Sequence, residues 1–296
     1  MNMKVCALQG GTCSTSIEDN NELITKHLKK TLKFSQPDLI VCSELMNLPY
    51  FAAVQPVNDT FFQYAEPKDG RTVTHFAQFA KDHQIHLIGT YFEVEEINQQ
   101  KYYYNTAFVC SPTRGLIGQY RKVHIPKVFD ATMVTDEKYY FEQFGDGGNS
   151  FPIFTLDNGL RIGILICFDR SFPEAWRSLS LQGVDLICVP TATYGYRKAL
   201  YTAELQVRAL ENNVYVVGVN KAGKERLEGE KIERVNFGLS CIIDPFGELL
   251  ETAGEEPWET ICATIDLEQI KRSKSRTNFL AERKPNTYHS LQGLPV

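Results

Sequence analysis

The hydrophobic positions along the chain follow two kinds of pattern. Continuous apolar runs are typical of buried strands, whereas apolar residues three and four positions apart are typical of a helix face. The runs predict strands at residues 3–9, 38–43, 85–94, 101–110, 116–121, 151–156, 160–166, 185–190, 214–219, 237–243, 248–252 and 260–265. Helical spacing predicts helices over 17–34, 71–84, 172–182 and 198–213, with a short helix within 266–296. This order predicts a layered α/β fold with mixed sheets.

Local signals mark several boundaries of these elements. Ser16 is placed to cap the first helix, and Asp157-Asn-Gly159 is a strong hairpin signal. Ser171 and Glu174 form a Ser-x-x-Glu capping box around a proline, which predicts a helix beginning directly after Ser171. Residues 123–150 show little periodicity, and such a long loop in a compact protein is usually functional.

Composition narrows the class of protein. The chain has 296 residues, 43% hydrophobic and 23% charged, and it shows no linker or internal repeat, so we expect one domain over 1–296. The net charge of −5 without a long basic run argues against nucleic acid or an anionic membrane as partner. No apolar stretch approaches the ~20 residues of a membrane span, and the apolar run at the N-terminus is too short for a signal peptide. We therefore expect a cytoplasmic protein.

The eight cysteines give no sign of a metal site or a disulfide framework. They stand at positions 6, 13, 42, 110, 167, 188, 241 and 262, without a Cys-x-x-Cys pair. Without a secretion signal, reduced buried thiols are the expected state. His83 and His86 lack a third ligand nearby, so we expect surface and core roles for them and no metal.

Cys167 is a candidate nucleophile. It follows the apolar run 160–166 and precedes the predicted helix, whose N-terminus would favour the thiolate. A small hydrophobic residue that finishes a core strand is an equally good interpretation of this stretch alone.

Glu44 and Lys122 occupy matching positions, each just after an apolar strand. Sites in α/β proteins are built at the carboxyl ends of strands. A carboxylate base, an ammonium that stabilises an oxyanion and the thiol of Cys167 would together catalyse acyl transfer. Each residue also has an ordinary interpretation, because strand ends are commonly polar.

Five segments carry a resemblance that goes beyond this pattern. They are SELMNLPYF around Glu44, YRKVHIP around Lys122, ILICFDRSFPEAWR around Cys167, DLICVPTAT after it, and ERKPNTYHSL in the tail. In this order they resemble the nitrilase, or carbon–nitrogen hydrolase, superfamily over nearly the whole chain. The resemblance implies a four-layer α-β-β-α sandwich with two mixed six-stranded sheets. It also implies a Glu44–Lys122–Cys167 triad, an assisting Glu137, and no metal or organic cofactor.

The resemblance also implies a homodimer or higher homo-oligomer, with residues 266–296 as a tail at the subunit interface. This tail contains Phe279 and Tyr288 but too little periodicity for a core of its own, which fits a wrapped tail and a loose one equally. The expected partners are further copies of the chain and a small carbamoyl or amide substrate.

The segments YRKVHIP, DEKYYFE and LQGVDLI look like those of carbamoyl-cleaving members. Arg170 stands where N-carbamoyl-D-amino-acid amidohydrolases have an arginine that binds the substrate carboxylate, and a guanidinium suits that role. Pairing with a structural acid such as Glu174 is the alternative. We therefore expect an N-carbamoyl amino acid as substrate. The alternatives are an N-carbamoylputrescine amidase, a β-ureidopropionase and an ω-amidase or aliphatic amidase.

Further substrate contacts follow from the same resemblance. They are His124, Thr193 and the amide N–H of Phe168, which would hold the oxyanion with Lys122. The chain departs from the D-amino-acid pattern at Ser171, where that pattern has a second arginine, and at Ala192 and Thr135. A non-catalytic scaffold is disfavoured by the intact triad. A true nitrilase is disfavoured because Cys167 is not followed by tryptophan and glutamate.

Overall fold

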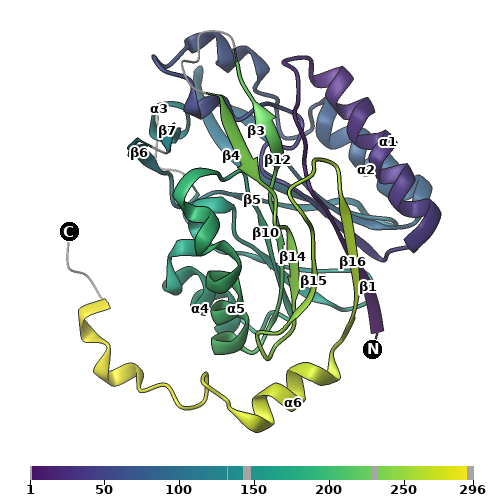
Figure 1. The fold of residues 1–296 in the computed structure, drawn as a ribbon, viewed down its shortest axis with the longest axis vertical. Helices are drawn as coiled ribbons and strands as arrows, with labels where there is room; N and C mark the ends of the chain where they lie inside the picture. The colour runs from purple at the N-terminus through teal and green to yellow at the C-terminus, as the bar shows by residue number, and fades with distance from the viewer. Residues whose placement is uncertain (1, 132, 143–147, 228–232, 292–296) are drawn as a thin grey trace.

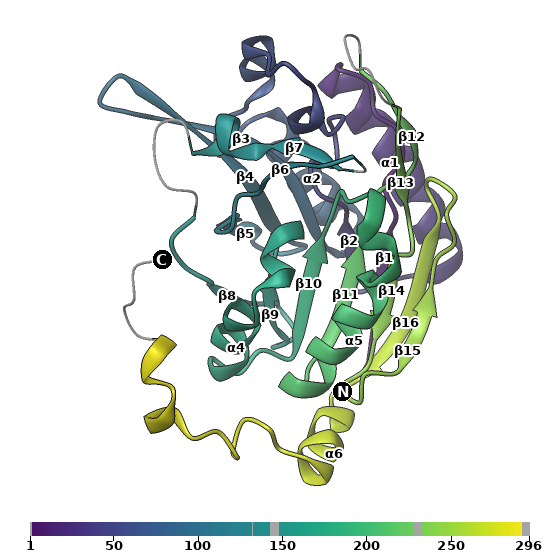
Figure 2. The same cartoon turned by 60° about the vertical axis from the view of Figure 1, so that its left-hand side comes forward.

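The computed structural model describes residues 2–131, 133–142, 148–227 and 233–291. Two six-stranded sheets form its centre (Figures 1 and 2). The first sheet has the order β16 (Thr260–Asp266), β1 (Asn2–Leu8), β2 (Leu39–Cys42), β3 (His86–Ile97), β4 (Gln100–Ser111) and β5 (Gly115–Arg121). The second has the order β15 (Leu249–Thr252), β14 (Cys241–Ile243), β11 (Tyr215–Val219), β10 (Leu186–Pro190), β9 (Arg161–Ile164) and β8 (Ile153–Thr155).

Helices cover the outer face of each sheet. The first sheet carries α1 (Ile17–Ser35) and α2 (Arg71–His83), and the second carries α4 (Pro173–Leu181) and α5 (Tyr201–Asn212). Both sheets mix parallel and antiparallel pairs, for example β1 with β2 and β1 with β16. The predicted four-layer α-β-β-α sandwich is therefore confirmed.

The inner strands are apolar on both faces because each face is covered. In β1, Val5 and Ala7 pack toward the second sheet, whereas Cys6 and Leu8 pack beneath the helices. This alternation follows from the two-residue period of a strand, and it explains why the inner strands read as continuous apolar runs.

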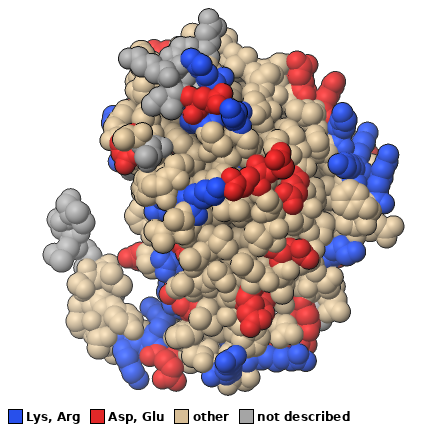
Figure 3. Space-filling model, viewed as in Figure 1, with Lys and Arg blue, Asp and Glu red and all other residues tan. Residues whose placement is uncertain are grey.

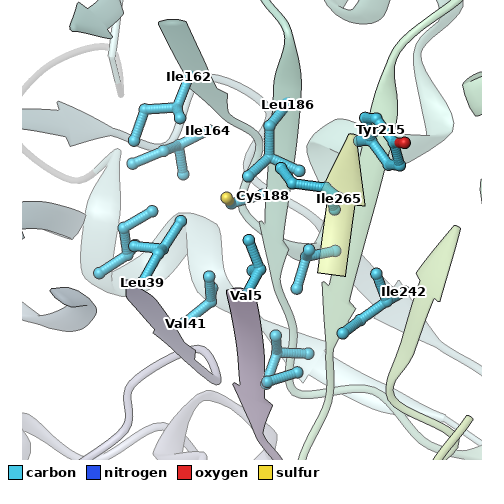
Figure 4. Close-up of a cluster of buried hydrophobic side chains, with 14 of the residues drawn as sticks. Val5, Leu39, Val41, Ile162, Ile164, Leu186, Cys188, Tyr215, Ile242 and Ile265 are labelled. Atoms are coloured by element: carbon cyan, nitrogen blue, oxygen red, sulfur yellow. The ribbon is translucent and has the colours of Figure 1, made fainter. Parts of the chain in front are cut away.

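Side chains of the two sheets meet in one buried cluster between them (Figure 4). Val5 and Leu39 come from the first sheet, and Ile164 and Leu186 from the second; each is at most 1% exposed. Burial of one such side chain stabilises the fold by about 1.5–3 kcal/mol. This cluster holds the two sheets, and thus the residues at their strand ends, in a fixed relation.

Smaller elements occupy the segments without periodicity. The stretch 123–150 contains β6 (Lys127–Phe129), β7 (Val134–Asp136) and α3 (Glu137–Phe141), and its residues 132 and 143–147 lie outside the described part. β12 (Ala222–Glu225) and β13 (Arg234–Phe237) form an antiparallel pair, and residues 228–232 between them lie outside the described part. The expected strand at 237–243 is interrupted, because Gly238 and Leu239 have positive φ angles between β13 and β14.

Two helix starts show the limits of local signals. Ser16 caps α1 as predicted, since its hydroxyl accepts a hydrogen bond from the Asp19 N–H (3.3 Å). The predicted capping box at Ser171 is wrong, because α4 begins after Phe172 without a side-chain cap. The Ser171 hydroxyl instead accepts a hydrogen bond from Arg197, which the 3₁₀ turn η4 (Gly195–Ala199) brings to it.

The expectation that all cysteines are reduced is wrong for one pair. Cys6 of β1 and Cys262 of β16 stand directly opposite each other in the antiparallel ladder and form a disulfide. Their sequence separation of 256 residues hides this contact from any local pattern. The other cysteines are free and buried.

The C-terminal segment leaves the body of the molecule (Figures 1 and 2). After α6 (Glu268–Arg276) it continues through two short 3₁₀ turns, Pro285–Thr287 and His289–Leu291. In the described part of the chain, no helix combines the length and hydrophobicity needed to span a bilayer. Most of the face in Figure 3 is uncharged, and its acidic and basic side chains lie in separate small groups, one of them a basic group over α1.

Candidate active site

The three residues singled out by the sequence come from both sheets. Glu44 follows β2 and Lys122 follows β5 in the first sheet, whereas Cys167 follows β9 in the second. All three are at most 5% exposed. The packing of one sheet on the other thus assembles them at one place.

Lys122 is the hub of the polar contacts. Its Nζ donates to Glu44 Oε1 (2.7 Å) and to both carboxylate oxygens of Glu137, at 2.8 and 2.7 Å. Burial alone would lower the pKa of Lys122, but Glu137 and Glu44 outweigh it and raise the pKa. Lys122 is therefore a fixed ammonium ion.

Two further groups orient Glu44. Asn105 Nδ2 donates to its Oε1 (2.8 Å), and the backbone N–H of Ala192 donates to its Oε2 (2.9 Å). Asn105 lies in β4, next to β5, the strand that Lys122 directly follows. Sequence reasoning missed Asn105, although an asparagine within a predicted apolar strand was a signal that could have found it.

Glu137 has a second partner in Tyr50, whose hydroxyl donates to Glu137 Oε1 (2.5 Å). Burial raises the pKa of Glu137 to about 7, and Lys122 and Tyr50 act against that rise. The Tyr50 hydroxyl also lies 2.8 Å from Thr135 Oγ1. Tyr50, inside the SELMNLPYF motif, is a contact that the sequence did not single out.

Cys167 begins the 3₁₀ turn η3 (Cys167–Ser171) in the left-handed region, with a φ of 48°. Burial, and then the charge of Glu44, raises the pKa of its thiol to about 12, although Lys122 and Arg170 act in the opposite direction. The expectation that a helix N-terminus favours the thiolate is wrong here, because α4 begins only at Pro173. The resting group is a thiol and needs a base.

Asp169 anchors the η3 turn. Its Oδ2 accepts hydrogen bonds from the Tyr120 hydroxyl (2.6 Å) and the Ile166 N–H (2.9 Å). Its Oδ1 accepts one from the His124 N–H (2.9 Å) and lies 2.8 Å from His124 Nδ1. Asp169 is fully buried, so it fixes the backbone on both sides of Cys167. Its role was not visible in the sequence, because these contacts are non-local.

A small cavity of about 30 Å³ reaches Cys167. Its lining consists of Tyr50, Pro126, Val128, Met133, Cys167, Phe168, Arg170, Thr193, Tyr196 and Arg197. Of the predicted substrate contacts, Phe168, Arg170 and Thr193 belong to this lining. The Thr193 hydroxyl is buried and has no hydrogen-bond partner among the described residues, so it is available to a substrate.

His124 takes a different place from the predicted substrate contact. Besides its bonds to Asp169, its ring stacks on Phe172 at 3.6 Å between centroids. It is not among the described residues that line the cavity. His124 therefore packs against the η3 turn and Phe172, outside the cavity lining.

Arg170 is held on two sides. Its Nη1 donates to the Cys167 carbonyl oxygen (2.7 Å) and lies 3.6 Å from the Cys167 Sγ. Its Nε lies 3.2 Å from Glu204 Oε2, so Arg170 has an acidic partner, as the alternative interpretation expected, but this partner is Glu204 and not Glu174. Arg197 shares this carboxylate, since its Nη2 donates to Glu204 Oε2 (3.0 Å).

A comparison with protein families shows which family the chain belongs to. The family model described as carbon-nitrogen hydrolase matches residues 4–275. The chain belongs to the carbon–nitrogen hydrolase family. An N-carbamoylputrescine amidase from Solanum lycopersicum is 31% identical over 97% of this chain and 94% of its own length. A nitrilase from Pyrococcus abyssi is 32% identical over 91% of this chain and 93% of its own.

A solved structure agrees with this assignment. The crystal structure of a carbon–nitrogen hydrolase from Helicobacter pylori G27 has a TM-score of 0.88 and 25% identity, with both chains covered completely. The predicted resemblance to the nitrilase superfamily is thus confirmed. The protein is an enzyme, a carbon–nitrogen hydrolase.

The site of this carbon–nitrogen hydrolase has a composition suited to acyl transfer. Cys167 offers a buried thiol, Glu44 a carboxylate and Lys122 a fixed ammonium, which are the kinds of group that serve as nucleophile, base and oxyanion partner in such reactions. Glu137 and Tyr50 complete the polar network on the other side of Lys122. Within the described ranges, no group of three or more His, Cys, Asp and Glu side chains is arranged to hold a metal ion.

Proposed function

We propose that this carbon–nitrogen hydrolase cleaves the ureido group of an N-carbamoyl amino acid, releasing the amino acid, carbon dioxide and ammonia. The charge of the cavity carries this proposal. Arg170 and Arg197 line the cavity, and Glu204 is the acid that they share. No Asp or Glu is among the described lining residues. One positive charge is left over, which favours a substrate with a carboxylate.

The first half of the proposed reaction forms a covalent intermediate. Glu44 takes the proton of the Cys167 thiol, and the sulfur attacks the ureido carbonyl carbon. The Lys122 ammonium and the Phe168 N–H stabilise the oxyanion. The C–N bond to the terminal nitrogen breaks, Glu44 returns the proton, and ammonia leaves. An S-carbamoyl derivative of Cys167 remains.

Water completes the reaction. Glu44, assisted by Glu137, takes a proton from the water as it attacks the intermediate, and the sulfur leaves as the thiol. The product is an N-carboxy amino acid, a carbamate, which decomposes to carbon dioxide and the free amino acid. The raised pKa of Glu137, about 7, lets this carboxyl exchange protons near neutral pH.

N-Carbamoylputrescine is the second candidate substrate. It is supported by relatives named N-carbamoylputrescine amidase, at 31% and 30% identity. Its cationic amine would need an acidic partner in the cavity. The two guanidiniums there repel it, which is why we rank it second.

A substrate panel tests the proposal. It compares N-carbamoyl-D- and L-amino acids, N-carbamoyl-β-alanine, N-carbamoylputrescine and simple amides by ammonia release. We expect the highest kcat/KM for a carboxylated ureido substrate and no turnover by Cys167→Ala, whose thermal unfolding should match the wild type. A higher kcat/KM for N-carbamoylputrescine or a neutral amide would contradict the substrate assignment. Activity retained by Cys167→Ala would contradict the nucleophile.

A further inference from the structure

We propose that Arg197 selects carboxylated substrates and that Arg170 is a positioning residue for the nucleophile. The inference deepens the proposed function and rests on it. It assigns to Arg197 the carboxylate-binding role that the sequence resemblance gave to Arg170.

The contacts of Arg170 suit positioning. Its side chain is 2% exposed, its Nη1 holds the Cys167 carbonyl oxygen at 2.7 Å, and its Nε faces Glu204. Its own carbonyl oxygen accepts the indole N–H of Trp176 (2.8 Å), which ties it to α4. These contacts engage Nη1 and Nε, so they hold the guanidinium against the backbone of Cys167 and against Glu204.

The contacts of Arg197 suit substrate recognition. Its side chain is 20% exposed, and it adjoins Tyr196, which is 51% exposed at the same cavity. Its Nη2 makes one bond to Glu204 and one to a neutral hydroxyl, that of Ser171 (2.8 Å). A substrate carboxylate can take the place of that hydroxyl and gain charge-assisted hydrogen bonds.

The position of Arg197 also accounts for a departure in the sequence. Ser171 stands where the D-amino-acid pattern has a second arginine. In the fold, Arg197 reaches the Ser171 hydroxyl from a turn 26 residues further along the chain. A guanidinium is thus present beside that position, supplied by η4 instead of η3.

Glu204 links the two arginines through one carboxylate oxygen. Its Oε2 lies 3.2 Å from Arg170 Nε and 3.0 Å from Arg197 Nη2. A single carboxylate neutralises one of the two guanidiniums. Because Arg170 is buried and committed to Cys167, the remaining positive charge is presented to the cavity by Arg197.

Paired substrates separate recognition from positioning. N-Carbamoylalanine and ethylurea differ by the carboxylate, so they are assayed with Arg197→Gln, Arg197→Lys and Arg170→Gln. For Arg197→Gln, we expect KM for N-carbamoylalanine to rise about 10- to 100-fold, and at least tenfold more than KM for ethylurea. Arg197→Lys should recover part of the loss. Arg170→Gln should lower kcat on both substrates by a similar factor.

Lys198→Gln is the matched control. Lys198 is the next residue, is 47% exposed and pairs with Glu255, so both kinetic constants should stay at wild-type values. Equal KM changes on both substrates in Arg197→Gln, or a selective KM increase in Arg170→Gln, would overturn the inference. If the wild type cleaves ethylurea and no carboxylated substrate in the panel, the proposed function itself is wrong. That outcome is distinguishable because it appears before any arginine is changed.

Discussion

At the scale of single residues, the proton equilibria of the site depend on burial and on a few contacts. Burial raises the pKa of both Glu137 and the Cys167 thiol. Lys122 opposes both effects, but it does not overcome them. Without a substrate, the Cys167 thiol therefore stays protonated near neutral pH, whereas Glu137 titrates there.

Tyr50→Phe tests the role of the hydroxyl on Glu137. The hydrogen bond from Tyr50 lowers the pKa of Glu137, so its removal should raise that pKa above about 7. If the Glu137 carboxylate assists, activity rises with pH as it ionises. The acidic limb of kcat/KM should then move to higher pH, and kcat/KM at pH 7 should fall about tenfold.

Thr135→Val is the control for this variant. It removes the other hydroxyl bonded to Tyr50 and leaves the Tyr50–Glu137 contact in place. Its pH profile should lie close to the wild type. A profile of Tyr50→Phe that coincides with the wild type would show that the hydroxyl does not tune Glu137.

At the scale of elements, the five-residue turn η3 holds Cys167, the proposed nucleophile. It follows β9, and one buried carboxylate, Asp169, accepts bonds from Tyr120, Ile166 and His124. The turn thereby connects a strand of the second sheet to β5 of the first. A shift at Asp169 would be transmitted directly to Cys167.

Asp169→Asn should destabilise the protein and reduce activity together. The asparagine amide keeps one acceptor oxygen but turns its NH2 group toward either the Ile166 N–H or the His124 N–H, which leaves that donor without an acceptor. We expect a loss of about 2–3 kcal/mol in the free energy of unfolding, measured in urea. Tyr120→Phe removes one of these bonds and should cost about 1 kcal/mol. Equal stabilities of the two variants would argue against Asp169 as the anchor.

The elements also show what the sequence could and could not predict. The inner strands were predictable because both faces are covered and their runs are apolar throughout. Glu44, Lys122 and Cys167 were predictable as strand-end residues within recognisable motifs. The contacts of Asn105 with Glu44 and of Asp169 with Tyr120 were not, because these partners lie far away in the chain. The capping box predicted for α4 failed for the same reason, because the Ser171 hydroxyl binds Arg197, a residue distant in the chain.

At the scale of the whole molecule, β1 and β16 join the two ends of the fold. They pair from Asn2↔Asp266 to Leu8↔Thr260, and the Cys6–Cys262 disulfide crosses this ladder. The bond closes a loop of nearly the whole sandwich. Long loops give the largest entropic stabilisation in the chain-entropy account of disulfides.

Thiol titration tests the disulfide. The denatured, unreduced protein should show the six free thiols of Cys13, Cys42, Cys110, Cys167, Cys188 and Cys241, and two more after reduction. Replacing Cys6 and Cys262 by alanine should lower the free energy of unfolding by about 2–4 kcal/mol. Wild type in reductant is the control. Titration of all the cysteines before reduction would contradict the bond.

The C-terminal segment is a candidate contact between copies of the chain. It extends from the body after α6 and exposes Phe279 (39%) and Leu291 (66%) (Figure 1). We propose that this tail contacts a second copy of the chain. Ending the chain after Arg276 should convert a dimer or larger oligomer into a monomer in sedimentation analysis. A full-length monomer would contradict the proposal, and an unchanged oligomer in the shortened chain would assign the interface to other surfaces.

The pairing of β1 with β16 has a consequence for how the chain could be rearranged. Residues 2 and 266 are neighbours in the sheet, whereas Asn98 and Gln99 form an exposed turn between β3 and β4. A circular permutant could therefore begin at Gln99, run through β16, and re-enter at β1 through a short linker. Glu44 would then come last in the chain and Lys122 first, while every strand kept its neighbours. The site thus depends on which strands lie side by side in the sheets, and it does not depend on the order in which Glu44 and Lys122 occur along the chain.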